Sequence, residues 1–334
     1  MRVLILFFTF LSFPLYSSLS VGQFDDRTQS LVYTTLSSDV SQEIKFKNRW
    51  LNESVYFSKD AQSVVSKEAE PISFYGAVGA KLEGFVFKRN SQELIIVVPP
   101  FGASLDQQIR FAGIFKEYDV IVCACQWSDS THTQKQFFNF LTSPLTMVFD
   151  DTIQAVINAC QWAREQGYEK VHALGSCYGG ILTAASQKKM KNNQLQGFDS
   201  LMLDSTPLSL SSVLKIALED PYGVLKKGKV QTFASYTRMI RTLRIASVAK
   251  YISEFFLKEY TMSCLLKESE VPLLLMYGTD DLLVPEAQWK DFLKDNATSQ
   301  MTVVVTPTKH LYASLKEKEL YREITQRFLN NELL

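Results

Sequence analysis

The sequence predicts an α/β fold in which a mostly parallel sheet is covered by helices on both faces. Two patterns support this prediction. Short apolar runs bounded by turn residues recur along the chain, as buried strands do, and stretches with a helical apolar stripe separate them. Strands that alternate with helices favour parallel pairing, because each crossover helix packs back onto the sheet.

The predicted strands begin with a hairpin in FYGAVGAKLEGFVFKR, at residues 74–89. Six buried strands follow, in LIIVVPP, YDVIVCACQW, KVHALG, SLMLDS, PLLLMYG and MTVVVTP. The preceding residues, 21–71, form a polar N-terminal extension in which LVYTTL and SVYFSK have the composition of strands. Residues 72–334 are expected to form one domain.

The clearest predicted helix is DDTIQAVINACQWAREQG, at residues 150–167. It begins with acidic residues, ends at a glycine and carries one apolar stripe, formed by Ile153, Val156, Ile157 and Cys160. Further helices are predicted for ILTAASQKKM, from Glu286, and over 311–329. Residues 206–268 contain the helical patches LSSVLKIAL and RIASVAKYISEFFLKEY, and they follow the sixth strand when the hairpin is counted.

An insertion at that point lies above the carboxyl ends of the strands, so 206–268 are predicted to form a helical lid or cap. An extra packing layer without substrate contact is the alternative, and the sequence leaves open whether this segment contacts a membrane or lipid. No repeat or linker divides the chain further.

The N-terminus predicts export. Met1-Arg2 is followed by VLILFFTFLSFPL, which is too short to span a bilayer, and then by the small polar residues YSSLS. This pattern is typical of a signal peptide over 1–20 that is cleaved near Ser20, so we expect a periplasmic or secreted protein. An uncleaved anchor is disfavoured because Pro14 interrupts the apolar run.

Composition limits the partners. The 35 basic and 35 acidic residues cancel, which argues against nucleic acid as a ligand. No phosphate loop, dinucleotide fingerprint or metal-ligand spacing is present, so no cofactor or metal is expected. A small-molecule substrate is expected instead. The cysteines are odd in number, which leaves at least one unpaired in an oxidising compartment: Cys123, Cys125, Cys160, Cys177 and Cys264.

The stretch VHALGSCYGG predicts a nucleophile on a tight turn between a strand and a helix. Such a turn needs small residues on either side of a strained apex, and Gly175, Gly179 and Gly180 supply them. This spacing puts Cys177 at the apex and Ser176 before it. The following helix begins at the apex, so its dipole favours a thiolate and the Tyr178 N–H is predicted to stabilise an oxyanion.

A thiol nucleophile needs a base, and the chain has three histidines. His310, in TPTKHLYAS, follows the last predicted strand, which brings it to the same sheet edge as Cys177. It is the predicted base. His172 lies inside a strand and is expected to be structural, and His132, in the polar loop DSTHTQ, is a less favoured candidate.

The predicted acid lies in YGTDDLLVP, after the strand PLLLM. A Gly-x-x-Asp-x-x-Val-Pro spacing selects Asp281. Asp280 is the alternative, and it could instead cap the helix that begins after Pro285.

Together GSCYGG, GTDDLLVP and TKHLY on alternating strands and helices resemble the α/β-hydrolase superfamily, over residues 72–334. With cysteine at the apex, the chain resembles dienelactone-hydrolase-like enzymes, which use Cys, His and Asp to open lactones or cleave esters. The box Gly-x-Cys-x-Gly-Gly and the strand end Val-Pro-Pro also resemble polyhydroxyalkanoate synthases, which are acyltransferases.

The resemblance implies an oxyanion hole with one unusual feature. Where most α/β hydrolases have His-Gly, this chain has Pro99-Pro100, and Pro100 has no N–H to donate. The Phe101 N–H is therefore predicted to pair with that of Tyr178, with Gly102 allowing close approach.

These observations predict an exported hydrolase that cleaves an ester, lactone or thioester through an acyl-cysteine intermediate on Cys177, with His310 and Asp281. Two alternatives remain open. One is an acyltransferase related to the polyhydroxyalkanoate synthases, and the other is a catalytically silent hydrolase fold that serves as a binding protein.

Overall fold

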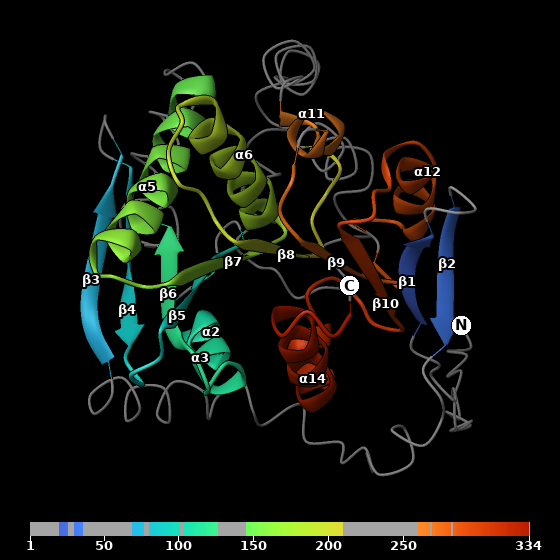
Figure 1. The fold of residues 1–334 in the computed structure, drawn as a ribbon, viewed down its shortest axis with the longest axis horizontal. Helices are drawn as coiled ribbons and strands as arrows, with labels where there is room; N and C mark the ends of the chain where they lie inside the picture. Colours follow the sequence, from blue (N-terminus) through green and yellow to red (C-terminus); the bar gives the residue numbers. More distant parts are fainter. Residues whose placement is uncertain are drawn as a thin grey trace, which may run out of the picture.

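A ten-stranded sheet is the centre of the structure, with strand order β2-β1-β10-β9-β8-β7-β5-β6-β4-β3 (Figure 1). The structure is a computed structural model. The residues it describes are 20–25, 30–35, 69–76, 80–100, 103, 105–125, 145–209, 260–267, 269–281 and 283–333.

The six central strands are parallel, and they are the six strands predicted from the apolar runs. Because they point the same way, their carboxyl ends share one edge of the sheet, where ligands bind in open α/β sheets. Their bounds are β5 (Glu93–Val98), β6 (Asp119–Cys125), β7 (Lys170–Ser176), β8 (Ser200–Asp204), β9 (Leu273–Gly278) and β10 (Met301–Thr306).

Antiparallel strands extend both edges of this parallel core. The predicted hairpin is present as β3 (Ala69–Tyr75) and β4 (Lys81–Phe87), and β4 pairs with β6. On the other edge, β1 (Ser20–Asp25) pairs with β10 and with β2 (Ser30–Thr35). The predicted strand in LVYTTL is thus confirmed by β2, whereas SVYFSK lies outside the described residues.

Helices cover both faces of the sheet, as Figure 1 shows. One face packs against α5 (Leu145–Glu165), α6 (Tyr178–Asn192), α11 (Met262–Leu266) and α12 (Glu286–Asn296). The opposite face packs against α2 (Leu105–Gln108), α3 (Arg110–Ile114), α13 (Ala313–Lys316) and α14 (Lys318–Leu329). The helix predicted over 311–329 is therefore two helices, separated at Glu317, whose φ and ψ of −113° and 41° are not helical.

Strand β5 shows why the sequence gives a sheet buried on both sides. Its alternate residues Leu94, Ile96 and Val98 belong to the core under α5 and α6. Ile95 and Val97 belong to the core on the other face, and all five side chains are fully buried. A strand that buries both faces must be apolar at every position, so it appears in the sequence as an unbroken apolar run.

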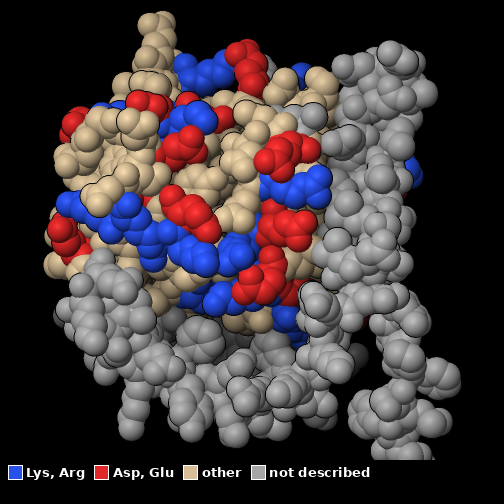
Figure 2. Space-filling model, turned by 60° about the horizontal axis from the view of Figure 1, so that its bottom comes forward, with Lys and Arg blue, Asp and Glu red and all other residues tan. Residues whose placement is uncertain are grey.

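Several predictions concern residues that the structure does not describe. The expected signal peptide lies almost wholly in 1–19, and most of the expected lid lies in 210–259. Among the described helices, none is both long and apolar enough to cross a bilayer. Over the described part of the surface drawn in Figure 2, acidic and basic side chains lie close to one another.

The central strands should dominate stability. We expect Ile96→Ala to lower the free energy of unfolding by about 2–5 kcal/mol, because it leaves a cavity in a fully buried strand. Denaturant unfolding followed by circular dichroism measures this. The same change at Ile72, a half-buried residue of the edge strand β3, should cost less, and equal losses at the two positions would contradict this account.

Candidate active site

Cys177 occupies the turn between β7 and α6, at the carboxyl edge of the sheet. Its φ and ψ are 52° and −119°, a combination that residues other than glycine rarely adopt. The turn is thus a strand-to-helix elbow, as predicted, with Cys177 at its apex. Ser176 is the last residue of β7 and is fully buried.

The three glycines around Cys177 are required by close packing. A Cβ on Gly175 would lie 2.6 Å from the Gly179 carbonyl oxygen, and one on Gly179 would lie 2.6 Å from that of Pro99. A Cβ on Gly180 would overlap the side chain of Thr206. The elbow therefore holds Cys177 in its strained conformation by close contacts with backbone carbonyls at the end of β5 and with the Thr206 side chain after β8.

His310 and Asp281 meet at the same sheet edge. The Nδ1 atom of His310 lies 2.8 Å from Oδ2 of Asp281, whose side chain is fully buried. The other carboxylate oxygen accepts the backbone N–H groups of Leu283 and Val284, both at 2.9 Å. Asp281 is thus held in one orientation from two sides. Asp280 is exposed, and the N-cap of α12 at Pro285 has no side-chain hydrogen bond, so the alternative capping role of Asp280 is wrong.

Cys177 and Asp281 act on His310 together. Burial lowers the pKa of its imidazole, but the interactions with Cys177 and Asp281 outweigh this effect and hold the pKa well above its usual range. Because Nδ1 faces Asp281, Nε2 is the ring nitrogen left for Cys177. The nucleophile, base and acid predicted from sequence are therefore brought together as one hydrogen-bonded group.

The other two histidines are not part of this group. His172 lies inside β7 and is buried, with Nδ1 2.8 Å from the Ser200 hydroxyl and Nε2 3.3 Å from Glu93 Oε2. This hydrogen bond lowers the pKa of Glu93 to about 2. The structural interpretation of His172 fits this position, and His132 lies outside the described residues.

The structure describes part of the predicted oxyanion hole. Tyr178 is the first residue of α6, next to Cys177, whereas Phe101 and Gly102 lie outside the described residues. The carbonyl groups of Val98 and Pro99 approach Gly179 closely, so the chain that leads into Phe101 packs against the elbow.

A second buried carboxylate, that of Asp204, lies close to the elbow and was not predicted from the sequence. Asp204 ends β8 and is almost fully buried. Its side chain accepts hydrogen bonds from the Ser205 hydroxyl at 3.0 Å and the Tyr321 hydroxyl at 3.2 Å, while burial raises the pKa of its carboxyl. The available signal was a polar Asp-Ser pair at the carboxyl end of the buried strand SLMLDS.

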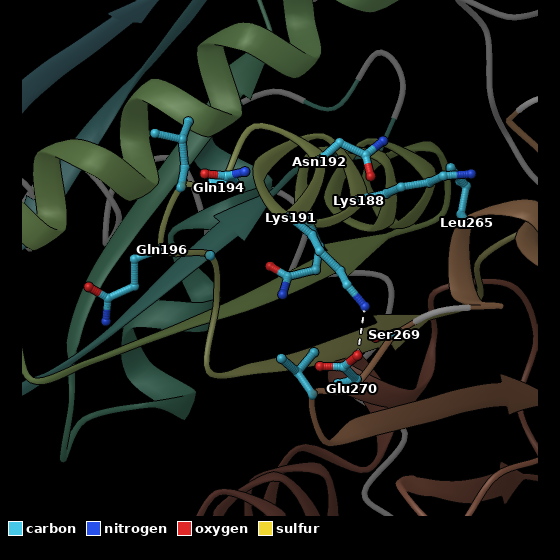
Figure 3. Close-up of a pocket in the computed structure, with 12 residues that line it drawn as sticks. Lys188, Lys191, Asn192, Gln194, Gln196, Leu265, Ser269 and Glu270 are labelled. Carbon is cyan, nitrogen blue, oxygen red and sulfur yellow. Dashed lines mark hydrogen bonds and ion pairs between the residues drawn. The ribbon is translucent and has the colours of Figure 1, made fainter.

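A cavity of about 500 Å³ lies away from this group, at the carboxyl end of α6 (Figure 3). Its lining includes Lys188, Lys191 and Glu270, and Lys191 forms an ion pair with Glu270 at 2.7 Å. Lys188 is eleven residues along the chain from Cys177, or about 16 Å of helix. The cavity is therefore separate from the candidate active site. Within the described residues, no cluster of three or more His, Cys, Asp or Glu side chains could hold a metal ion.

The sequence matches no protein-family model and no curated protein, but solved structures share its fold. An esterase from Pyrococcus furiosus superposes with a TM-score of 0.55 at 13% identity, over 80% of this chain and 93% of the esterase. An α/β hydrolase from Penicillium sp. sh18 gives 0.52 at 16% identity, over 79% and 99%. A hyperthermophilic esterase from Pyrobaculum calidifontis gives 0.51 at 12% identity, over 84% and 94%.

These similarities show the fold of the chain, which is the α/β-hydrolase fold predicted from the sequence. In this fold a parallel sheet carries the nucleophile on an elbow between a strand and a helix.

The elbow glycines give a direct test of the packing argument. We expect Gly179→Ala to destabilise the fold by about 1–3 kcal/mol or more, because the new methyl group meets two backbone carbonyls that cannot move aside. Gly113→Ala is the matched control, since a Cβ there lies 3.7 Å from its nearest neighbour, at the end of a lysine side chain. Thermal unfolding of both variants measures the difference, and equal midpoints would contradict the argument.

The effect of Cys177 on His310 can be measured directly. We expect Cys177→Ser to lower the pKa of His310, because the interaction with Cys177 is the largest of the effects that raise this pKa. NMR titration of the imidazole resonances measures this, and Cys264→Ser serves as the control. An unchanged pKa of His310 in Cys177→Ser would show that Cys177 does not act on the ring.

Proposed function

We propose that the protein hydrolyses a carboxylic ester, lactone or thioester, with Cys177 as nucleophile, His310 as base and Asp281 as the group that orients the base. One observation carries this proposal. A cysteine at a strained turn, at the N-terminus of a helix, interacts with a histidine that is itself bonded to a buried carboxylate.

The first half of the reaction forms an acyl-cysteine. His310 takes the thiol proton, and the thiolate sulfur bonds to the carbonyl carbon of the substrate, whose oxygen becomes an oxyanion. The carbonyl then re-forms, the bond to the leaving oxygen or sulfur breaks, and the His310 imidazolium gives its proton to the leaving group. The raised pKa of His310 fits this role, because the imidazolium must exist beside the thiolate before attack.

The second half releases the acid. His310 takes a proton from water, the water oxygen bonds to the acyl carbon, and the carbon–sulfur bond breaks as the proton returns to Cys177. We assign the oxyanion hole to the backbone N–H groups of Tyr178 and Phe101. The position of Tyr178 in the first turn of α6 supports this assignment, because helix N-termini stabilise developing negative charge.

The similar solved structures support a hydrolase that acts on ester substrates. Two of the similar structures are described as esterases and one as an α/β hydrolase. The resemblance to dienelactone-hydrolase-like enzymes favours an activated or strained acyl group, since thiolates attack such carbonyls readily. We further propose that the protein is exported and that 206–268 cover the site.

Chemical labelling tests the nucleophile without a known substrate. We expect iodoacetamide to modify Cys177 at least about tenfold faster than Cys160 or Cys264 at pH 7, because thiolates react and thiols do not. Burial raises the pKa of the Cys160 thiol to about 12, so it should react very slowly. In His310→Ala, Cys177 should no longer react faster than the other two cysteines. Mass spectrometry of tryptic peptides measures the labelling rate of each cysteine.

His172→Gln is the control, since it removes a histidine outside the site. Labelling of Cys177 no faster than that of Cys160 would overturn the catalytic proposal and favour a silent binding protein. With p-nitrophenyl acetate, a burst of nitrophenolate and an acetylated Cys177 peptide are expected. If an added alcohol or thiol acceptor increases turnover, the acyltransferase replaces the hydrolase as the function.

A further inference from the structure

Ser205 connects the two sides of the candidate active site. It follows Asp204 at the end of β8 and has a φ of 50°. Its hydroxyl donates a hydrogen bond to Oδ1 of Asp204 at 3.0 Å and accepts one from the backbone N–H of Leu311 at 3.2 Å. Leu311 is the residue directly after His310, so the hydroxyl bridges a buried carboxylate and the loop that carries the histidine.

Ser205 and Leu311 in this bridge share a positive φ with the nearby Cys177. Cys177, Ser205 and Leu311 have φ angles of 52°, 50° and 60°, although none is glycine. Such residues each cost free energy and persist only where neighbouring contacts hold them. The hydrogen bond from Leu311 to Ser205 is a contact of this kind.

Asp204 extends the bridge to the nucleophile. Its backbone carbonyl accepts the N–H of Cys177 at 2.8 Å, and its carboxylate is held from the other side by Tyr321 of α14. Burial raises the pKa of the Asp204 carboxyl, and Arg110 and His310 oppose part of this effect. The dipeptide Asp204-Ser205 is therefore bonded both to the elbow and to the histidine loop.

We propose that Ser205 is a positioning residue whose hydroxyl holds the His310 loop at the distance and angle that Cys177 requires. This inference rests on the proposed function. The hydrogen bond between His310 and Asp281 sets the rotation of the imidazole ring. The hydrogen bond from the Leu311 N–H to Ser205 instead fixes the position of the backbone that carries the ring. Because a displacement of about 1 Å can slow an enzyme by about 100-fold, the second constraint matters as much as the first.

The test removes the hydroxyl without adding strain. Ser205→Gly suits the positive φ, so it deletes the bridge while glycine tolerates the backbone conformation. We expect iodoacetamide labelling of Cys177 and kcat for p-nitrophenyl acetate to fall between about 10-fold and 100-fold, with KM changed less than twofold. We also expect the pKa of His310, measured by NMR, to fall as the ring moves away from the thiolate.

Ser186→Ala is the matched control. Ser186 is a fully buried serine of α6 whose hydroxyl donates a hydrogen bond to the Leu182 carbonyl at 2.8 Å. Its replacement therefore shows the effect of removing a buried hydroxyl that is not bonded to the His310 loop. It should change stability without changing kcat, labelling or the His310 pKa. Ser205→Ala should slow the reaction as Ser205→Gly does and cost additional stability, because alanine is strained at this φ.

The outcomes separate the two proposals. The positioning role is overturned if Ser205→Gly leaves both the rate of Cys177 labelling and the pKa of His310 unchanged. In that case the proposed function still stands, provided that His310→Ala slows the labelling of Cys177. If Cys177 of the wild type is no more reactive than Cys160, the proposed function fails. The His310 pKa in Ser205→Gly then still decides whether Ser205 places the ring.

Discussion

Backbone packing around Cys177 determines the arrangement of the whole carboxyl edge. The carbonyls of Val98 and Pro99 close one side of the turn, and the Thr206 side chain closes another. The N–H of Cys177 is bonded to Asp204, so β5, β7 and β8 all contribute to holding one strained residue. Parallel order makes this convergence possible, because successive strands end at the same edge whatever their separation in sequence.

Electrostatics couples this rigid turn to the stability of the protein. The pKa of His310 is raised in the folded state, so its imidazolium adds stability that is fully present below the unfolded value of about 6.5. This contribution is lost as pH rises through the folded pKa. The interactions of His310 with Cys177 and Asp281 that raise this pKa therefore also stabilise the fold below the folded pKa.

The sequence predicted much of this arrangement because its signals are local. An unbroken apolar run identifies a strand such as β5, and the spacing of Gly175 and Gly179 identifies the apex between them. The Asp204-Ser205 pair is visible at the end of SLMLDS, but its partners Leu311 and Tyr321 lie more than 100 residues away in the chain, so no local spacing connects them. The break at Glu317 was also invisible, because the helical pattern continues on both sides of it.

A second hydrogen-bonded group with similar residue types lies toward the other end of β7. Ser200, His172 and Glu93 form a hydrogen-bonded series with the composition of a catalytic triad. Ser200, however, is the first residue of strand β8 and is almost fully buried. Cys177 differs in backbone conformation, in partial exposure and in the helix that starts beside it. The two groups therefore differ in their backbone setting, and Ser200, His172 and Glu93 form a hydrogen-bond network within neighbouring strands.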